Sequence, residues 1–321
     1  MRYVIYGAGA VGGTIGGRLA KHGSDVVLVA RGDHGRAIRA DGLRLHSPDD
    51  SVVLPIPCVE HPGEIDLRPD DVVVLSMKTQ DTAPALDALR AVAPPEVAVV
   101  CAQNGVENER LAARRFANVY AMCVMLPATH LEAGSVDVSS SPVSGILDLG
   151  RFPSGSDDVA AAIAADLERS SFSSRPDAAI MRLKYSKLLS NLGNALDAAC
   201  GPGARGGDLH SRARKEALDC YAAAGIDAAT ADEDRARRGD LMSVRPIEGR
   251  PRGGSSSWQS LARGTGSIES DYLNGEIVLL GLLHGVPTPV NALLQATAGR
   301  LAREGGQPGS VPLEDLTAQL A

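Results

Sequence analysis

The sequence predicts an α/β protein with a doubly wound parallel sheet in its N-terminal half and an all-helical domain in its C-terminal half. In the first half, short apolar runs alternate with helical patterns, as βαβ units require. After about Ser174 the sequence changes to long helical stretches without a convincing strand. Since 321 residues exceed the usual size of one compact core, we place an N-terminal domain at 1–175 and a C-terminal domain at 176–321.

The N-terminal half begins with a βαβ unit. The apolar run Arg2–Tyr6 predicts a strand, 13–22 a helix, and 25–30 a second strand that ends at Arg31. A further helix is predicted at 83–92, and further strands are predicted at 71–77, 97–102, 119–126 and 135–149. The last of these segments is a candidate for an antiparallel strand.

The C-terminal half contains helical patterns at 177–199 and at 267–284. The Thr288-Pro289 pair is an N-cap and first-turn signal for a last helix. Between these patterns, the arginines of 235–252 are interrupted by acids, glycine and proline, which favours a solvated loop. The adjoining Gly/Ser/Arg-rich stretch 249–257 is expected to be mobile.

The composition argues against several classes of protein. A formal net charge of -7 gives no basic surface for nucleic acid, and no apolar run approaches the ~18 residues of a membrane span. Five scattered cysteines without a Cys-x-x-Cys pair indicate reduced thiols in a cytoplasmic protein. The histidines lack metal-ligand spacing, so we expect no metal. The first residues run straight into a strand and glycine turn, and are expected to belong to the fold rather than to a signal peptide.

A glycine-rich turn carries the clearest functional signal. In such a turn the first glycine permits the tight bend, the second lets the backbone approach a pyrophosphate, and the third lets helix pack on strand. The amides of the following helix then face the phosphates. A flexible turn is the alternative, but the position between a strand and a helix favours a dinucleotide-binding, Rossmann-type fold. The predicted cofactor contacts are Gly7, Gly9, Ala10, Val11 and Gly12.

The end of the second strand predicts which dinucleotide is bound. An acidic residue there would bind the ribose 2′-hydroxyl of NADH, whereas an arginine pairs with the 2′-phosphate of NADPH. This chain has Arg31 at that point. Asp33 is the competing acid, but it is expected to lie past the strand end, in a loop at 32–34. The sequence therefore predicts NADPH, against the alternative that Arg31 is a solvated surface residue.

One face of a predicted helix combines lysine with amides. Lys184, Lys187, Asn191 and Asn194 are spaced i, i+3, i+7 and i+10. They could simply form the solvent-exposed polar face of an amphipathic helix. However, the chain uses only five lysines beside 27 arginines (32 in total), and lysine is the cation that can act as a general acid. The asparagines could orient a small polar substrate. Periodicity does not separate Lys184 from Lys187.

Together these motifs resemble the ketopantoate reductase family over most of the chain. Beyond the glycine turn and Arg31, the resemblance rests on several motifs in order. These are Met77-Lys78-Thr79-Gln80-Asp81-Thr82, Gln103-Asn104-Gly105, Lys187-x-x-x-Asn191, Ser255-Ser256-Ser257-Trp258-Gln259-Ser260 and Glu269-Ser270-Asp271-Tyr272-Leu273-Asn274-Gly275. The family consists of two-domain enzymes that use NADPH to reduce 2-dehydropantoate to pantoate.

The resemblance implies roles for the matching residues. Lys187 would protonate the carbonyl oxygen as hydride arrives, with Glu269 beside it and also assigned to the cofactor. This favours Lys187 over Lys184. Lys78 and Asn104 would serve the cofactor and the nicotinamide pocket. The alternative for Glu269, without the resemblance, is a carboxylate that the helix dipole favours near a helix N-terminus.

The substrate is implied to contact three further residues. Ser257 would bind its carboxylate, Asn191 would contact it, and Asn194 is a looser match to a second asparagine. Tyr185 stands where the family usually has tryptophan, and 195–254 looks unlike familiar members. The substrate is therefore expected to be 2-dehydropantoate or a related 2-keto acid.

Two other functions remain as alternatives. A β-hydroxyacid dehydrogenase also pairs a glycine-rich fold with a lysine and an asparagine one turn on, but Arg31 and the segment 269–275 argue against it. A non-catalytic NADPH-binding regulator would need neither Lys187 nor Glu269. Whether the helical domain forms a homodimer is left open by the sequence.

Overall fold

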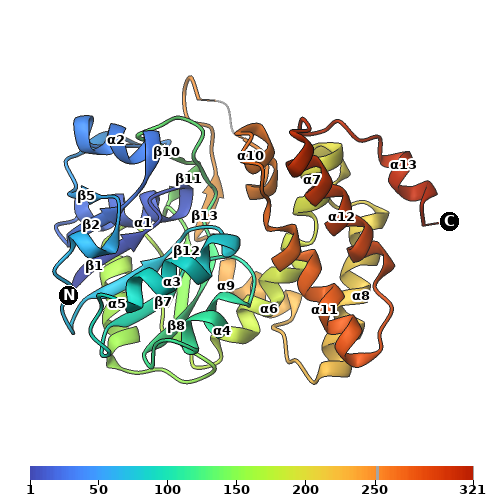
Figure 1. Ribbon diagram of the computed structural model, residues 1–321, viewed down its shortest axis with the longest axis horizontal. Coiled ribbons are helices and arrows are strands. Elements are labelled where there is room, and N and C mark those ends of the chain that lie inside the picture. The colour runs from blue at the N-terminus through green and yellow to red at the C-terminus, as the bar shows by residue number, and fades with distance from the viewer. Residues whose placement is uncertain (251–252, 321) are drawn as a thin grey trace. The chain divides into compact units, whose positions relative to one another are not determined.

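The structure, a computed structural model, describes residues 1–250 and 253–320 (Figure 1). Residues 251 and 252, which belong to the predicted loop at 235–252 and the predicted mobile stretch at 249–257, lie outside the described residues. The chain forms two compact units. The first comprises Met1–Leu183 and the described part of Asp232–Arg252, and the second comprises Lys184–Ala231 and the described residues from Gly253 onward. The predicted fold class, a parallel sheet followed by a helical region, is confirmed.

A seven-stranded sheet forms the centre of the first unit, in the order β12-β8-β7-β6-β1-β2-β5. All neighbouring strands are parallel except β12, which is antiparallel to β8. The strands are β1 (Arg2–Tyr6), β2 (Asp25–Val29), β5 (Cys58–Val59), β6 (Val72–Leu75), β7 (Ala98–Cys101), β8 (Val119–Met125) and β12 (Ile146–Arg151). β6, β7 and β8 are buried along their whole length, which explains their continuous apolar sequence.

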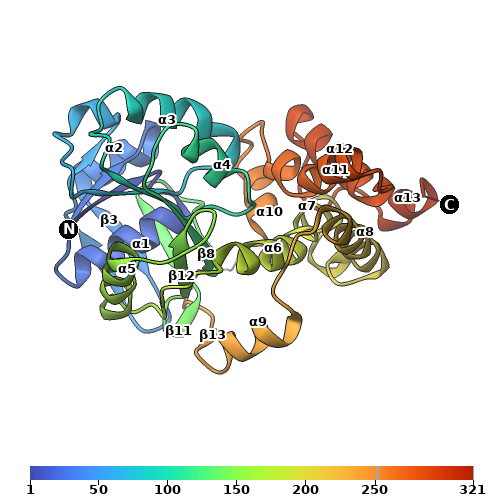
Figure 2. The same cartoon turned by 90° about the horizontal axis from the view of Figure 1, so that it is seen from below.

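Helices cover both faces of this sheet (Figure 2). On one face, α1 (Ala10–Lys21) and α5 (Asp158–Arg169) contribute Ile15, Leu19, Ile163 and Leu167 to one hydrophobic core. On the other face, α3 (Thr82–Arg90) and α4 (Asn108–Ala113) contribute to a second core. The remaining helices of this region are α2 (Gly32–Asp41), η1 (Pro62–Glu64) and η2 (Thr79–Asp81).

A four-stranded sheet of order β4-β3-β10-β9 was not predicted, although β10 falls within a predicted strand. It consists of β3 (Leu43–His46), β4 (Ser51–Leu54), β9 (Ala128–Thr129) and β10 (Ser135–Val138). The predicted strand at 135–149 is therefore three strands, β10, β11 (Ser140–Pro142) and β12, in three different sheets. Asp50, in the β3–β4 turn, forms ion pairs with Arg18 and Lys21 of α1. These ion pairs connect the four-stranded sheet to the helix that packs on the seven-stranded sheet.

Residues 232–250, which we call the returning segment, pack on the first unit although they follow part of the second in sequence. They include most of α9 (Ala231–Arg238) and all of β13 (Met242–Val244), which is antiparallel to β11. Arg245 pairs with Asp49, and Arg250 pairs with Asp137. The prediction of a loop was therefore wrong where α9 and β13 form, although most of the described residues of 235–250 are exposed, as predicted. Arg237, Arg245 and Arg250 have acidic partners far away in sequence.

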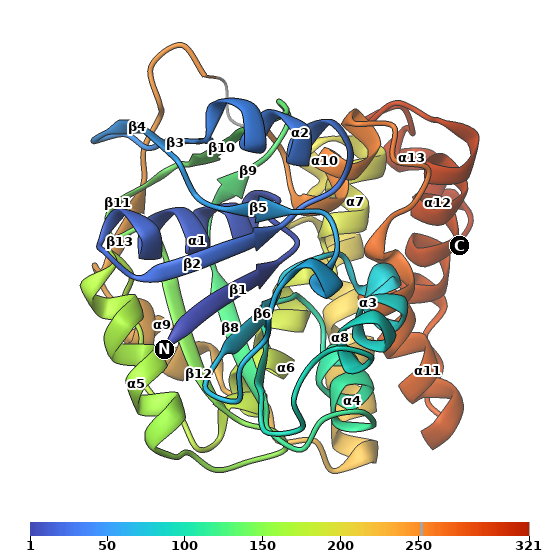
Figure 3. The ribbon, with the colours of Figure 1, turned by 60° about the vertical axis from the view of Figure 1, so that its left-hand side comes forward.

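The second unit is helical in the part that the structure describes (Figure 3). Its main helices are α7 (Asn194–Cys200), α8 (Asp208–Ala224), α11 (Asn274–His284) and α12 (Pro289–Glu304), which pack against one another, α8 on α11 and α12, and α12 on α7. α6 (Ile180–Asn191) begins in the first unit and ends in the second. The shorter elements are η3 (Pro202–Ala204), α10 (Ser256–Ala262), η4 (Glu269–Tyr272) and α13 (Leu313–Ala318).

Both predicted long helices of this region are interrupted. The pattern at 177–199 is α6 and α7, separated at 192–193, and the pattern at 267–284 is η4 and α11. Thr288 is the N-cap of α12, as predicted, but its side chain does not bond the helix. Instead Glu216 of α8 accepts hydrogen bonds from the backbone N atoms of Val290 and Asn291 at 2.9 and 3.0 Å. α12 is followed by α13, so it is not the last helix.

Candidate active site

The predicted cofactor residues of the first unit all follow strands of the parallel sheet. The glycine turn follows β1, Arg31 follows β2, Lys78 follows β6 and Asn104 follows β7. These four strands are adjacent, in the order β7-β6-β1-β2. Carboxyl ends of neighbouring parallel strands meet at one edge, and β1 is where the strand order reverses direction. Ligands of open α/β sheets bind at such a point.

The glycine turn is closely packed at Gly7 and Gly12 and open at Gly9. Gly7 has φ +101°, and a Cβ there would lie 2.7 Å from the backbone N of Met77. A Cβ at Gly12 would lie 2.2 Å from the carbonyl oxygen of Gly7, so the start of α1 packs directly on the turn. A Cβ at Gly9, the N-cap of α1, would meet nothing within 4 Å. The open side of the turn is therefore at Gly9, where the N-terminal amides of α1 are available to an anion.

Two side chains that the sequence did not indicate hold this turn. The Ser76 hydroxyl donates to the carbonyl oxygen of Gly7 at 2.8 Å. His34 Nδ1 accepts from the backbone N of Gly134 at 2.9 Å, and its Nε2 lies 2.7 Å from the carbonyl oxygen of Ala8. Because Nδ1 accepts, Nε2 carries a proton and donates to the carbonyl oxygen of Ala8. No motif spacing could have indicated these contacts.

Arg31 lies directly beyond β2, is exposed, and is the N-cap residue of α2. Asp33 lies in the first turn of α2, not in a loop as predicted. Its carboxylate forms an ion pair with Arg36 on the same helix. The acid is therefore paired, whereas Arg31 stands at the strand end where an arginine would meet a 2′-phosphate.

A buried polar network joins the loops that carry Lys78 and Asn104. Gln103 donates through Nε2 to the carbonyl oxygen of Met77 and to the Thr82 hydroxyl, at 3.0 and 2.7 Å. Thr82 donates to Asn108, whose amide in turn donates to the carbonyl oxygen of Asn104 at 3.1 Å. Lys78 and Asn104 are both half-buried. Bonds inside the protein thus fix the backbone positions beside both predicted cofactor residues.

The second unit carries Lys187 and Asn191 one helical turn apart on α6. Lys187 is half-buried, whereas Lys184 is 3% exposed. Asn191 is also 3% exposed, and its amide Nδ2 has no hydrogen-bond partner among residues 1–250 and 253–320. A buried amide without a partner is costly. Asn191 therefore marks a point where a polar ligand would complete the hydrogen bonding.

Asn194 does not share a continuous helix with Lys187. α6 ends at Asn191, and Asn194 begins α7 after the break at 192–193. The spacing i, i+10 therefore overestimated the regularity of this face, although Asn194 is also buried. Ser257 lies in the first turn of α10 and Glu269 begins η4; they are 2% and 3% exposed.

Both parts of the chain that carry these candidate residues match models of a known protein family. The family model for ketopantoate reductase PanE/ApbA matches residues 3–154. The model for the ketopantoate reductase PanE/ApbA C terminal matches residues 179–302. The chain belongs to the ketopantoate reductase family. It is therefore an oxidoreductase of a dinucleotide-binding family.

Relatives of this ketopantoate reductase family member match along nearly the whole chain. A 2-dehydropantoate 2-reductase of Halobacterium salinarum is 28% identical over 95% of this chain and 100% of its own length. A 2-dehydropantoate 2-reductase of Pyrococcus horikoshii is 26% identical over 95% and 99%. The crystal structure of a PanE/ApbA family ketopantoate reductase from Ralstonia eutropha has a TM-score of 0.77 at 29% identity, covering 95% and 99%. D-mandelate dehydrogenase with NADH and anilino(oxo)acetate shares the fold, with a TM-score of 0.80 at 22% identity over 95% and 99%.

Tyr185 of this family member, which replaces the expected tryptophan, packs inside the helical unit. Its ring meets that of Tyr221 edge-on, with centroids 5.3 Å apart, and its carbonyl oxygen accepts from the Tyr221 hydroxyl at 3.1 Å. Burial raises the pKa of Tyr221 well above its ordinary value. The substitution therefore has a packing role between α6 and α8.

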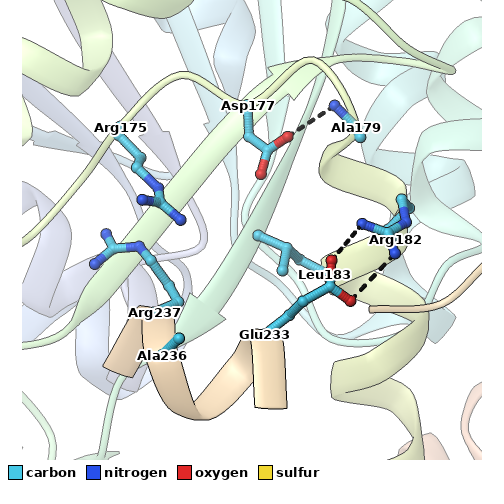
Figure 4. A pocket seen from close by; sticks show the side chains of 8 residues that line it. All are labelled: Arg175, Asp177, Ala179, Arg182, Leu183, Glu233, Ala236 and Arg237. Atoms are coloured by element: carbon cyan, nitrogen blue, oxygen red, sulfur yellow. Dashed lines mark hydrogen bonds and ion pairs between the residues drawn. The ribbon is translucent and has the colours of Figure 1, made fainter. Parts of the chain in front are cut away.

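A cavity of about 310 Å³ in the first unit does not belong to the cofactor edge. Figure 4 shows the guanidinium groups of Arg175 and Arg237 facing one another, and Arg182 paired with Glu233. Arg237 donates two 2.6 Å bonds to the buried Asp148. Arg175 and Arg237 thus pair with Asp148, and Arg182 pairs with Glu233. The cavity lies where α9 packs on the first unit.

The described residues share three further general features. No group of three His, Cys, Asp or Glu side chains among them could hold a metal ion. Within the same residues, no helix is both long and apolar enough to span a membrane. The five cysteines are free thiols.

Proposed function

We propose that this protein reduces a 2-keto acid, 2-dehydropantoate or a close relative of it, with NADPH. The observation that carries the proposal is the buried amide of Asn191, one helical turn from Lys187, whose Nδ2 finds no hydrogen-bond partner in the described part of the chain. That pair gives a polar substrate both a hydrogen-bond donor and a cation. Relatives that match nearly the whole chain are described as 2-dehydropantoate 2-reductases, and this supports the choice of substrate.

The residues of the sheet edge fit the proposed cofactor. The backbone at Gly9 is open to a pyrophosphate, α1 offers its N-terminal amides, and Arg31 stands where a 2′-phosphate would lie. Lys78 and Asn104 would contact the cofactor from the next two strands, with Gly7, Ala10, Val11 and Gly12 forming the rest of the turn. When bound, NADPH supplies the hydride.

In the proposed reaction Lys187 stabilises the developing charge on the ketone oxygen and then donates its proton there. Preorganised charge of this kind contributes several kcal/mol when water is excluded. Glu269 would lie beside the lysine and contact the cofactor. Ser257 would bind the substrate carboxylate, and Asn191 and Asn194 would orient the substrate.

Arg31→Ala tests the choice of cofactor. A charge-assisted contact to phosphate contributes about 1.5–3 kcal/mol, so the Kd for NADPH should rise about 10- to 100-fold while that for NADH changes little. Arg36→Ala, on the same helix, is the control and should leave both affinities unchanged. Fluorescence titration with each dinucleotide measures the ratio. Tighter binding of NADH than of NADPH by the unaltered protein would refute the assignment.

Lys187→Ala tests the reaction. We expect kcat to fall by at least ~10², the range of general acid catalysis, with the Kd for NADPH near normal. Lys215→Ala is the control, because Lys215 lies on α8 in an exposed ion pair with Asp219. The assay follows NADPH absorbance with 2-dehydropantoate, other branched 2-keto acids and an aryl 2-keto acid. A fully active Lys187→Ala enzyme would remove Lys187 from the mechanism.

The same assays separate the two alternatives. A β-hydroxyacid dehydrogenase would oxidise hydroxy acids in preference to reducing keto acids. A non-catalytic regulator would bind NADPH tightly with every keto acid inert. The free cysteines fit a cytoplasmic protein, which is part of the proposal. Analytical ultracentrifugation gives the molar mass in solution and so shows whether a homodimer forms.

A further inference from the structure

A buried carboxylate in the second unit has no role in the proposed reaction. Asp197 lies on α7, three residues after Asn194, and is 3% exposed. Its Oδ2 accepts a hydrogen bond from the backbone N of Ser255 at 2.7 Å. In the part of the chain that the structure describes, it forms no ion pair. Burying a carboxylate that accepts one hydrogen bond from an amide costs stability. A functional reason for Asp197 at this position is therefore expected.

The residue that Asp197 holds is the N-cap of α10. The Ser255 hydroxyl accepts from the backbone N of Trp258 at 3.2 Å and lies 3.4 Å from the carbonyl oxygen of Asn194, to which it donates. Ser255 is thus tied to α7 at two points one helical turn apart. The start of α10 cannot shift along α7 without breaking both bonds.

The surrounding turn is closely packed. A Cβ at Gly254 would lie 2.5 Å from Cγ of Trp258, so the indole packs directly on the glycine. Gln259 Nε2 donates to the carbonyl oxygen of Gly254 at 3.2 Å. Ser257 lies within this turn, two residues after Ser255 and one before the packed indole. Fixing Ser255 therefore fixes the direction in which the Ser257 side chain leaves the backbone.

We infer that Asp197 is a positioning residue that holds the first turn of α10, and with it the Ser257 hydroxyl, in a fixed place on α7. The inference rests on the proposed function in one respect, the role of Ser257 in binding the substrate carboxylate. Asp197 touches neither the substrate nor the cofactor in this scheme. It acts through Ser255.

The kinetic test compares Asp197→Ala with Asp197→Asn. Loss of a hydrogen bond to a charged group corresponds to about a 10- to 100-fold change, so Asp197→Ala should raise the KM for the keto acid at least about tenfold. kcat and the Kd for NADPH should stay near normal. Asp197→Asn keeps an acceptor for the Ser255 amide and should restore the KM. Asp219→Ala, which removes an exposed carboxylate from α8, is the control.

A double variant tests whether the effect passes through Ser257. In the Ser257→Ala background, Asp197→Ala should raise the KM no further, because the hydroxyl that it positions is already absent. Independent, additive increases would overturn the inference. So would an Asp197→Ala enzyme with an unchanged KM, or an Asp197→Asn enzyme as impaired as Asp197→Ala.

A readout without substrate keeps the inference separate from the proposed function. Trp258 is the only tryptophan of the chain, so its fluorescence reports on α10 alone. Acrylamide quenching should increase in Asp197→Ala and stay unchanged in Asp197→Asn and Asp219→Ala. Unchanged quenching in Asp197→Ala would refute the positioning role. If quenching increases but no keto acid is reduced by the unaltered enzyme, the proposed function fails and the local role stands.

If Asp197→Ala does not fold, the donor can be removed instead. Ser255 has φ -57°, which proline adopts, and proline lacks the N–H that Asp197 accepts. Ser255→Pro and Ser255→Ala both lose the hydroxyl, but only Ser255→Pro loses the amide. Greater quenching and a higher KM in Ser255→Pro than in Ser255→Ala would support the inference, and equal values would contradict it.

Discussion

Two glycines of the same turn should respond to alanine in opposite ways. At Gly9 an added Cβ meets no atom within 4 Å, and φ of -69° suits alanine. At Gly12 the added Cβ would lie 2.2 Å from the Gly7 carbonyl oxygen and 2.2 Å from the Ser76 hydroxyl. Gly9→Ala should therefore keep the fold and obstruct the cofactor, whereas Gly12→Ala should damage the fold itself.

The magnitudes follow from these contacts. Gly12→Ala must move backbone, and overpacking of this severity costs about 3 kcal/mol or more, which lowers the Tm by about 6–12 °C for a domain of this size. Gly9→Ala exchanges a weak N-cap preference for lower chain entropy, so its Tm should change by less than about 2 °C. Losing one amide contact to phosphate should raise its Kd for NADPH about 10- to 100-fold.

The assay combines thermal unfolding without cofactor and fluorescence titration with NADPH. If Gly9→Ala binds NADPH as the unaltered protein does, the open side of the turn is not where the pyrophosphate lies. If Gly12→Ala melts normally, α1 is not packed on the turn as described. Either result would refute the geometric reasoning independently of any keto acid.

Two further predictions concern ion pairs of the first unit. Arg237→Ala leaves Asp148 buried without its bidentate partner and should cost about 3–5 kcal/mol in urea unfolding, whereas Arg235→Ala, an exposed residue of the same helix, should cost less than about 0.5 kcal/mol. Burial would raise the pKa of Asp50, but hydrogen bonds, first that from Lys21, lower it to about 2. Because the folded pKa is depressed, this stabilisation is present above the unfolded value and lost as the pH falls; Asp50→Asn should cost about 2 kcal/mol at pH 7 and roughly half that at pH 3.

The sequence predicted best what depends on neighbours in sequence. Strand β1 has the predicted bounds, because apolar runs between turn residues report burial directly. The residues after β1, β2, β6 and β7 could be placed at one edge because parallel strands impose it. Which loops meet was predictable, but the network through Gln103 and Asn108 that fixes them was not, since side-chain partners carry no periodic signal.

The elements that were missed are held by distant partners. α9 is polar on nearly every side, and its position is set by Arg237 binding Asp148, 89 residues earlier. β4 is only half-covered and too short for its alternation to stand out. The break between α6 and α7 depends on packing around Gly193, which the helical spacing of Lys187, Asn191 and Asn194 did not reveal.

The returning segment has a consequence for synthesis on the ribosome. A nascent chain that has emerged only to Leu183 lacks β13 and Arg237, so β11 has no partner strand and Asp148 keeps only Arg175, whose guanidinium lies 3.9 Å away, in place of the bidentate pair with Arg237. Roughly 70 more residues must follow before the segment is complete, which takes about 3–14 s at ordinary translation rates. The first unit is therefore complete only after the returning segment has been synthesised. A fragment cut at Leu183 should be less stable than the same unit within the whole chain.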